Sequence, residues 1–302
     1  MAEPSLLVVD KPGGITSHQV VARARRALGT KRVGHAGTLD PMATGVLVLG
    51  IEKGTRLLGH LSLTTKTYEA TIRLGQATNT DDADGEVTDA PGATLADVGP
   101  RLQASVAALT GTISQVPSSV SAIKVDGKRA YALVRQGADV ELAPREVTVS
   151  RFDVRDVRDV RPVDAAGTPA VDLDVVVDCS SGTYIRALAR DLGASLGTGG
   201  HLTALRRTRV GPFGLEHATW DAHLPDLTRG ELFDVQPYPL AAIAPLAFAT
   251  IEVDADAARD IGYGRPLALA VPRDPTALVH DGRLLALYRP APGGSVPVAV
   301  LV

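Results

Sequence analysis

The sequence has a single cysteine, Cys179, among 302 residues. An intrachain disulfide is therefore excluded, and nothing in the chain points to an oxidising compartment. The first residues show no basic segment followed by a long apolar one, which a secretory signal requires. The longest apolar stretch, around residues 240–253, is interrupted by Pro245 and is too short to span a bilayer. We therefore expect a cytoplasmic protein that does not enter a membrane.

The chain also lacks an excess of positive charge and the common nucleotide-cofactor motifs. Its formal net charge is −3, whereas proteins that bind RNA by general phosphate attraction are usually basic. It has neither a glycine loop ending in Gly-Lys-Ser/Thr nor a G-x-G-x-x-G motif. If the chain binds RNA, the positive charge must be concentrated locally. Three groups of basic residues could supply it; the alternative is that each is an ordinary solvated surface. The groups are Arg23, Arg25, Arg26, Lys31 and Arg32; Lys124, Lys128 and Arg129; and Arg206, Arg207 and Arg209.

What is present is the composition of a globular protein of about two domains, with 45% hydrophobic and 22% charged residues. Thr16 and Gln19 have the spacing of a capping box, and the helix that follows should end at Gly29. Residues 68–74 alternate apolar and polar side chains, as a half-buried strand does. The remaining periodicity predicts helix over 95–109, β structure over 147–160 and 171–177, and a helix over 185–196 that Thr183 caps.

The last third of the chain has a different composition. Prolines 237, 239 and 245 suggest a linker over 236–245. Short β-like runs follow at regular spacing, which predicts a small β-barrel or sandwich. These runs are 248–253, 267–271, 277–280, 284–288 and 298–301.

The segment Gly34–Gly45 (GHAGTLDPMATG) is the most informative in the chain. Its three glycines allow backbone angles closed to other residues and close approach of a substrate. Pro41 stiffens the turn and disfavours helix at Asp40. We therefore expect a shaped turn that presents the Asp40 carboxylate; an ordinary solvated loop acid is the alternative.

This segment resembles the catalytic motif of the TruB family, the bacterial tRNA pseudouridine-55 synthases. Five further segments, in family order and covering most of residues 5–215, resemble the other motifs of that family. They are Leu7–Gly14 (LVVDKPGG), Lys66–Glu69 (KTYE), Arg73–Gln76 (RLGQ) with Thr80–Gly85 (TDDADG), Cys179–Arg186 (CSSGTYIR) and His201–Arg207 (HLTALRR).

The resemblance implies an α/β (α+β) pseudouridine-synthase fold with a mixed, mostly antiparallel central sheet flanked by helices. The catalytic domain would span 1–238, with an RNA-gripping insertion at about 117–145. A small PUA-like β domain would span 239–302, although a plain structural cap is the alternative there. The chain departs from the family at Val120, where a tyrosine is usual, which puts one stacking contact in doubt.

The resemblance also implies the reaction: uridine 55 in the T arm of tRNA becomes pseudouridine by base flipping and an aspartate-dependent exchange of the glycosidic bond. The partner is the T-arm stem-loop, and no cofactor or metal is implied. The chain has no long basic tails, so we expect an enzyme that works without guide RNA. We also expect a monomer.

The family pattern assigns three catalytic residues. Asp40 would act at the sugar, since a carboxylate is ionised at neutral pH without tuning. Arg186 would pair with it, although Arg186 with Arg190 could form an exposed helix stripe. Tyr68 would stack on the target base, an interaction worth about 1–3 kcal/mol; a core tyrosine on a strand is the alternative. Whether Asp40 attacks C1′ or removes a C2′ proton stays open.

Further positions match residues that bind the substrate. They are His35, which would enter the RNA and fill the vacated stack; Tyr184 and Leu205, which would line the base pocket; Asp82, which would lie near Arg186; and Lys11, which would touch phosphate or brace the turn. A metal role for His35 is disfavoured because no second histidine or cysteine lies at ligand spacing. The acidic run 81–84 fails as a calcium loop because Thr80 and Pro91 would occupy ligand positions.

Two other functions compete with the enzyme hypothesis. A non-catalytic RNA-binding module would need neither Asp40 nor Arg186. A hydrolase acting on a nucleoside or sugar usually needs two opposed carboxylates, and the motifs supply one acid paired with an arginine.

Overall fold

The structure, a computed structural model, describes residues 2–118, 124–125, 128–129, 142–160, 166–219 and 235–302. The chain divides into two compact units, the first from Met1–Thr64 with Arg209–Val302 and the second from Thr65–Thr208. The chain therefore leaves the first unit once and returns once. The division at residue 238 that the sequence suggests stays a prediction.

The first unit begins with an antiparallel sheet. Its central strand β1 (Ser5–Lys11) pairs with β14 (Tyr238–Pro239) on one side and with β3 (Thr44–Ile51) on the other, and β2 (Val33–Ala36) also pairs with β3. Helix α1 (Ser17–Ala27) joins β1 to β2. The remaining short elements are the 3-10 helix η1 (Glu52–Leu57), α2 (Leu58–Ser62), β13 (Phe213–Gly214), which pairs with the end of β12 (Gly200–Val210), and the 3-10 helix η2 (Leu215–His217).

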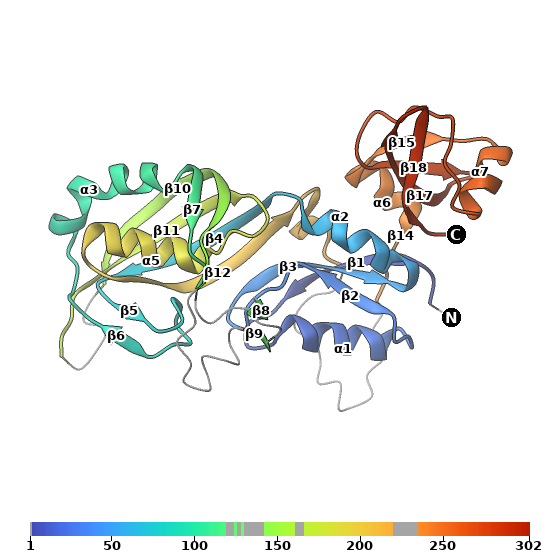
Figure 1. Cartoon of the computed structure of the whole chain (residues 1–302). Helices are drawn as coiled ribbons and strands as arrows, with labels where there is room; N and C mark the ends of the chain where they lie inside the picture. Colours follow the sequence, from blue (N-terminus) through green and yellow to red (C-terminus); the bar gives the residue numbers. More distant parts are fainter. Residues whose placement is uncertain (1, 119–123, 126–127, 130–141, 161–165, 220–234) are drawn as a thin grey trace. The chain divides into compact units, whose positions relative to one another are not determined.

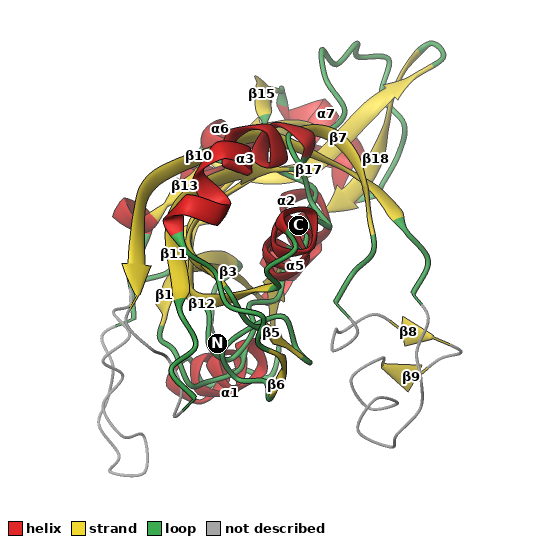
Figure 2. Ribbon diagram, turned by 90° about the vertical axis from the view of Figure 1, so that its left-hand side faces the viewer, coloured by secondary structure: helices red, strands yellow, loops and turns green. Residues whose placement is uncertain are grey.

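The C-terminal residues of this unit form a β domain whose sheet is accompanied by helices (Figure 2). Its sheet has the order β15-β16-β17-β18, with β15 parallel to β16 and the other pairs antiparallel. The elements are α6 (Leu240–Ala247), β15 (Ala249–Glu252), α7 (Ala255–Gly262), β16 (Thr276–His280), β17 (Arg283–Ala291) and β18 (Gly294–Val300). One hydrophobic core holds side chains from both ends of the chain, among them Val8, Val48, Ile243 and Leu287.

The sequence-based prediction for this region was wrong in three places. Residues 240–247 form α6 instead of a linker, because burial of Leu240 and Ile243 outweighs the backbone hydrogen bond that Pro245 cannot make. Helix α7 was missed although Asp254 caps it, accepting a hydrogen bond from Ala257 N at 2.8 Å. The run 267–271 contains only an isolated bridge.

The second unit is built on the sheet β12-β4-β11-β10-β7 (Figure 1). Helices α3 and α5 pack on each other and on this sheet. The alternating burial along β4 confirms the predicted strand over 68–74. The helices and strands of the second unit, besides β12, are β4 (Lys66–Leu74), β5 (Ala77–Thr78), β6 (Val87–Asp89), α3 (Leu95–Ala108), β7 (Gly111–Gln115), β8 (Lys124–Val125), β9 (Lys128–Arg129), β10 (Arg145–Val160), β11 (Ala170–Cys179) and α5 (Ile185–Leu196).

The beginning of α5 differs from the prediction. Thr183 is not its cap: the residue before the helix is Tyr184, and no side chain caps it. The Thr183 hydroxyl instead donates to the carbonyl of Ser180 at 3.0 Å, inside the preceding turn. Gly197 ends the helix in the left-handed conformation, as expected. Val120 lies outside the described residues.

Candidate active site

The Asp40 turn is a braced loop between β2 and β3, in the first unit. The hydroxyl of Ser17, at the start of α1, accepts a hydrogen bond from Leu39 N at 2.9 Å and donates one to Leu39 O at 3.0 Å. On the other side of Asp40, Gly14 N donates to Pro41 O at 2.9 Å. The capping box of Thr16 and Gln19 is present, so helix α1 starts at a fixed point beside the turn. The Asp40 backbone is therefore held from both sides.

Lys11 is fully buried against the same turn. Its ammonium group donates to the carbonyls of Pro12 and Ile15 at 2.7 Å and of Pro41 at 3.2 Å. An ammonium has three protons, and three carbonyls accept them here. These contacts favour the bracing alternative for Lys11 and give no support to a direct phosphate contact.

The glycines of the motif have two different roles. Gly37 and Gly45 adopt positive φ angles of 76° and 102°, which other residues rarely reach. Gly34 does not; there a Cβ atom would lie 3.0 Å from a methyl group of Leu58, so close packing favours glycine. His35, on β2, is half-buried, and the ring of His18 meets it edge-on with the centroids 5.5 Å apart.

Arg186 lies in the first turn of α5, in the second unit, and is only 4% exposed. Its Nη1 donates to Thr80 O at 2.7 Å and lies 3.4 Å from the carboxylate of Asp82, which is also buried. Asp82 in turn accepts hydrogen bonds from the Thr80 hydroxyl and from Asp84 N. The exposed-stripe alternative for Arg186 is therefore wrong, and Asp82 lies beside it as expected.

The preceding residue, Asp81, holds the other arginine of this helix. Its carboxylate accepts a hydrogen bond from the Ser118 hydroxyl at 2.6 Å and one from Arg190 Nη1 at 3.3 Å. Burial raises the pKa of Asp81, which these two donors partly counteract. Asp81 also has a positive φ of 60°, uncommon for a residue with a side chain. Sequence reasoning did not find this pairing, because the two residues are 109 positions apart.

Gln115 is a second residue that sequence reasoning missed. It is the last residue of β7 and is 1% exposed. Its side-chain amide donates to Tyr184 O at 3.0 Å and accepts from Tyr184 N at 2.8 Å. The sequence offers no signal for it beyond a polar residue that closes a strand.

Tyr68 and Leu205 are buried on the second unit's sheet. Lys66 lies two residues before Tyr68 on the same face of β4, next to Cys179 of β11. Burial, reinforced by the nearby Arg207 guanidinium, lowers the pKa of Lys66 to about 8. Arg207 is itself almost fully buried, so the prediction that it belongs to a surface basic group was wrong.

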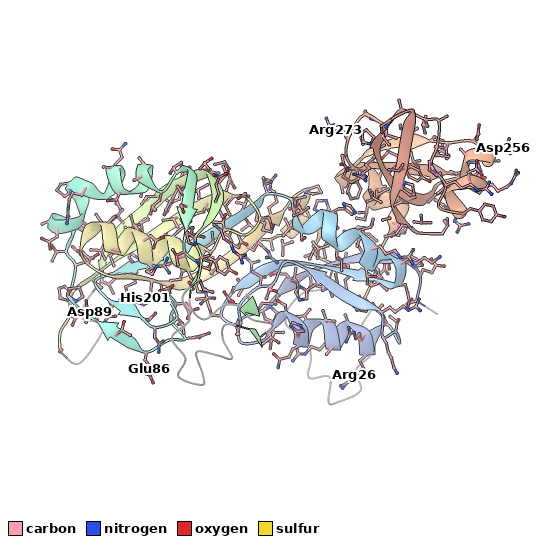
Figure 3. All side chains as sticks on the ribbon, in the orientation of Figure 1. Arg26, Glu86, Asp89, His201, Asp256 and Arg273 are labelled. Carbon is pink, nitrogen blue, oxygen red and sulfur yellow. The ribbon has the colours of Figure 1, made fainter. Side chains whose placement is uncertain are left out.

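The basic group around helix α1 is largely exposed, unlike Arg207. Arg25, Arg26, Lys31 and Arg32 are exposed, and Figure 3 shows Arg26 on α1. The Arg25 guanidinium also has a structural contact, because its Nη2 donates a hydrogen bond to Val33 O at 2.8 Å. The side chains of Lys124, Lys128 and Arg129 lie outside what the structure describes.

Burial also has a measurable consequence for Cys179. It raises the pKa of this thiol from 9.0 to about 11. The thiolate is the reactive form, and this difference leaves about 10²-fold less of it near neutral pH. We expect the folded protein to react with Ellman's reagent at pH 8 far more slowly than the chain in guanidinium chloride. Prompt reaction of the folded protein would contradict this expectation.

The two halves supply different chemistry. The first offers a carboxylate from a braced turn, and the second a buried guanidinium, Arg186, two residues after Tyr184. The pairing of Asp40 with Arg186 stays a prediction, as do the roles of Tyr68, Tyr184, Leu205 and His35. No group of His, Cys, Asp and Glu side chains suited to a metal occurs among the described residues, and no helix in that part is long and apolar enough to cross a membrane.

Solved structures with the same architecture identify the fold class. One titled as an H/ACA RNP bound to a substrate RNA containing 2'-deoxyuridine has a TM-score of 0.67 at 24% identity, over 99% of this chain and 85% of that one. A Cbf5-Nop10-Gar1 complex gives 0.66 at 24%, with the same coverage. At this identity the likeness shows the fold alone. The chain has the pseudouridine-synthase fold, with a mostly antiparallel sheet and a C-terminal β domain.

Sequence comparison then gives the family. Residues 25–185 match the model for the TruB family pseudouridylate synthase (N terminal domain), and 186–229 match the tRNA pseudouridylate synthase B C-terminal domain. The chain is 53% identical over 304 residues to "tRNA pseudouridine synthase B" of Cutibacterium acnes, covering 99% of each. It is 58% identical to the protein of that name from Nocardia farcinica, over 98% of this chain and 92% of that one. The chain belongs to the TruB family of pseudouridylate synthases and is an enzyme.

Proposed function

We propose that this enzyme converts uridine 55 in the T arm of tRNA to pseudouridine. One observation carries the proposal: relatives named for a tRNA pseudouridine synthase are 53% and 58% identical to this chain over nearly their full lengths. The braced Asp40 turn and the buried Arg186 supply the kind of groups that such a reaction needs.

The reaction is an isomerisation. The bond between N1 of the uracil and C1′ of the ribose breaks, the base turns, and a bond forms between C5 and C1′. The C5 proton leaves and N1 gains one, so atoms and electrons balance without an oxidant or a group donor. No cofactor is therefore needed for the balance. The target nucleotide must first leave its stack, at a cost of a few kcal/mol.

The residues divide this work as follows. The Asp40 carboxylate acts at the ribose, either by attacking C1′ or by removing the C2′ proton. Arg186, which the family pattern pairs with this carboxylate, stabilises its ionised form. Tyr68 stacks on the detached base. The flipped nucleotide also contacts Tyr184 and Leu205, and His35 fills the place it leaves in the RNA.

We further propose that the enzyme acts alone, as a cytoplasmic monomer. Two of the solved structures of similar fold are titled as ribonucleoprotein or multiprotein complexes. The bacterial relatives, in contrast, match this chain from end to end at more than twice that identity. That similarity supports an enzyme that recognises the T-arm stem-loop directly, without guide RNA.

The test uses purified protein and an unmodified tRNA transcript. Pseudouridine mapping should show one new modification, at position 55, and an isolated T-arm stem-loop should suffice as substrate. A tRNA whose uridine 55 is replaced by cytidine serves as the control. Modification at another position would overturn the assignment to uridine 55. A requirement for added RNA or protein would overturn the proposal that the enzyme acts alone. Release of free uracil would indicate a hydrolase.

A further inference from the structure

The root of the predicted insertion, residues 115–118, is attached to helix α5 at two points. Gln115 binds the backbone of Tyr184, and Ser118 shares the Asp81 carboxylate with Arg190. Arg190 also donates to Val116 O at 2.8 Å. We propose that Gln115 is a positioning residue for the reaction: it fixes the start of α5 and thereby the placement of Tyr184 and Arg186. This inference rests on the proposed function of that site.

The start of α5 is where such an attachment has the largest effect. Helices α1, α3 and α7 each have a side-chain cap, from Thr16, Thr94 and Asp254. Helix α5 has none; Tyr184 precedes it in an extended conformation. A cap normally satisfies a free backbone N–H and fixes where a helix begins. At α5 no side chain caps the helix, and the Gln115 amide instead holds the backbone of Tyr184, the residue before it.

The Gln115 amide occupies both backbone groups of Tyr184. Tyr184 O also accepts the first hydrogen bond of the helix, from Leu188 N at 3.2 Å. A buried amide has a donor and an acceptor in fixed relation, so the pair of bonds restricts rotation of the Tyr184 peptide units. Arg186 follows two residues later, so a shift of Tyr184 displaces the guanidinium as well.

The second attachment lies one helical turn further along. Arg186 and Arg190 are four residues apart and therefore project from one face of α5. The adjacent Asp82 and Asp81 receive them, one each. Asp81 keeps its positive φ in this arrangement, and uncommon backbone conformations of this kind concentrate at functional sites. The acidic turn, the root of the insertion and the face bearing Arg186 thus form one hydrogen-bonded assembly.

The first measurement compares Gln115→Ala with wild type on a T-arm stem-loop tritiated at C5 of its target uridine. At saturating enzyme, the single-turnover rate constant should fall by about 10²-fold, the loss that small misplacement of reacting groups causes. The Kd for the stem-loop should stay within about threefold. Gln103→Ala, at an exposed glutamine of α3, is the matched control and should change neither quantity.

A pH profile separates positioning from loss of packing. In Gln115→Glu the ionised carboxylate repels Tyr184 O, whereas the protonated acid can donate to it. Burial raises the pKa of such a carboxyl group. The rate of Gln115→Glu relative to wild type should therefore rise as the pH falls from 8 to about 5.5. The corresponding ratio for Gln115→Ala should stay flat.

Hydrogen exchange gives a readout that needs no substrate. Backbone amides of residues 180–190 should exchange faster in Gln115→Ala than in wild type or Gln103→Ala. An inactive wild type with this exchange pattern would count against the proposed function alone. An unchanged exchange pattern, or loss of RNA affinity with an unchanged rate constant, would overturn the positioning role.

Discussion

Replacing Asp40 with asparagine should abolish pseudouridine formation while leaving RNA binding almost unchanged. The amide is uncharged and a poor nucleophile, so neither route at the ribose remains open to it. Loss of a reacting group in other enzymes costs about 10⁴-fold or more, and we expect a decrease of at least about 10⁴-fold in single-turnover rate constant. Tritium release from C5-labelled stem-loop measures the rate, and filter binding measures affinity.

The turn should survive this substitution. The bracing contacts described above use backbone atoms of Leu39 and Pro41, and asparagine has nearly the same shape as aspartate. Removing a negative charge beside a polyanion should not weaken its binding. Asp256→Asn, at an exposed acid on α7 (Figure 3), is the matched control and should behave as wild type. Parallel loss of binding and turnover would favour the non-catalytic RNA-binding module.

Local rules predicted the parts of the site that lie within one segment. The capping box at Thr16 depends on two residues three positions apart, and both of its hydrogen bonds are present. Pro41 follows Asp40 directly, and Asp40 lies in a loop as expected. Gly197 similarly ends α5. In each case neighbouring residues determine the geometry, so the sequence contains the necessary information.

The errors share a different cause. Thr183 looked like a helix cap, but the residue at that helix start is held by Gln115, 69 positions away in the sequence. Arg207 looked like a surface cation, yet it is buried beside Lys66. Both outcomes depend on which strands become neighbours in the sheet, and residue spacing along one segment does not encode that. The assignment of Arg186 came from family resemblance; its spacing from Arg190 also fitted an exposed helix stripe.

Replacing Arg186 with methionine should destabilise the fold and remove activity through separate effects. Methionine fills a similar volume but leaves the Asp82 carboxylate buried without its cation. Breaking a buried ion pair costs about 3–5 kcal/mol. We expect about 3 kcal/mol, the lower end of that range, because Asp82 keeps its hydrogen bonds from Thr80 and Asp84. Urea unfolding measures this loss. The turnover should fall by at least about 10²-fold, the usual effect of losing a preorganised charge-stabilising group.

The double variant Arg186→Met with Asp82→Asn distinguishes the two effects. The asparagine side chain introduced there would be neutral and its Oδ1 could still accept both hydrogen bonds, so most of the lost stability should return. Turnover should stay as low as in the single variant, because the guanidinium is still missing. A stable but inactive double variant would therefore show that Asp82 serves Arg186 and that Arg186 serves the reaction. If the double variant recovered turnover as well as stability, Arg186 would have only a structural role. If the single variant Arg186→Met were as stable as wild type, the buried Asp82 carboxylate would not need Arg186 as its counter-charge.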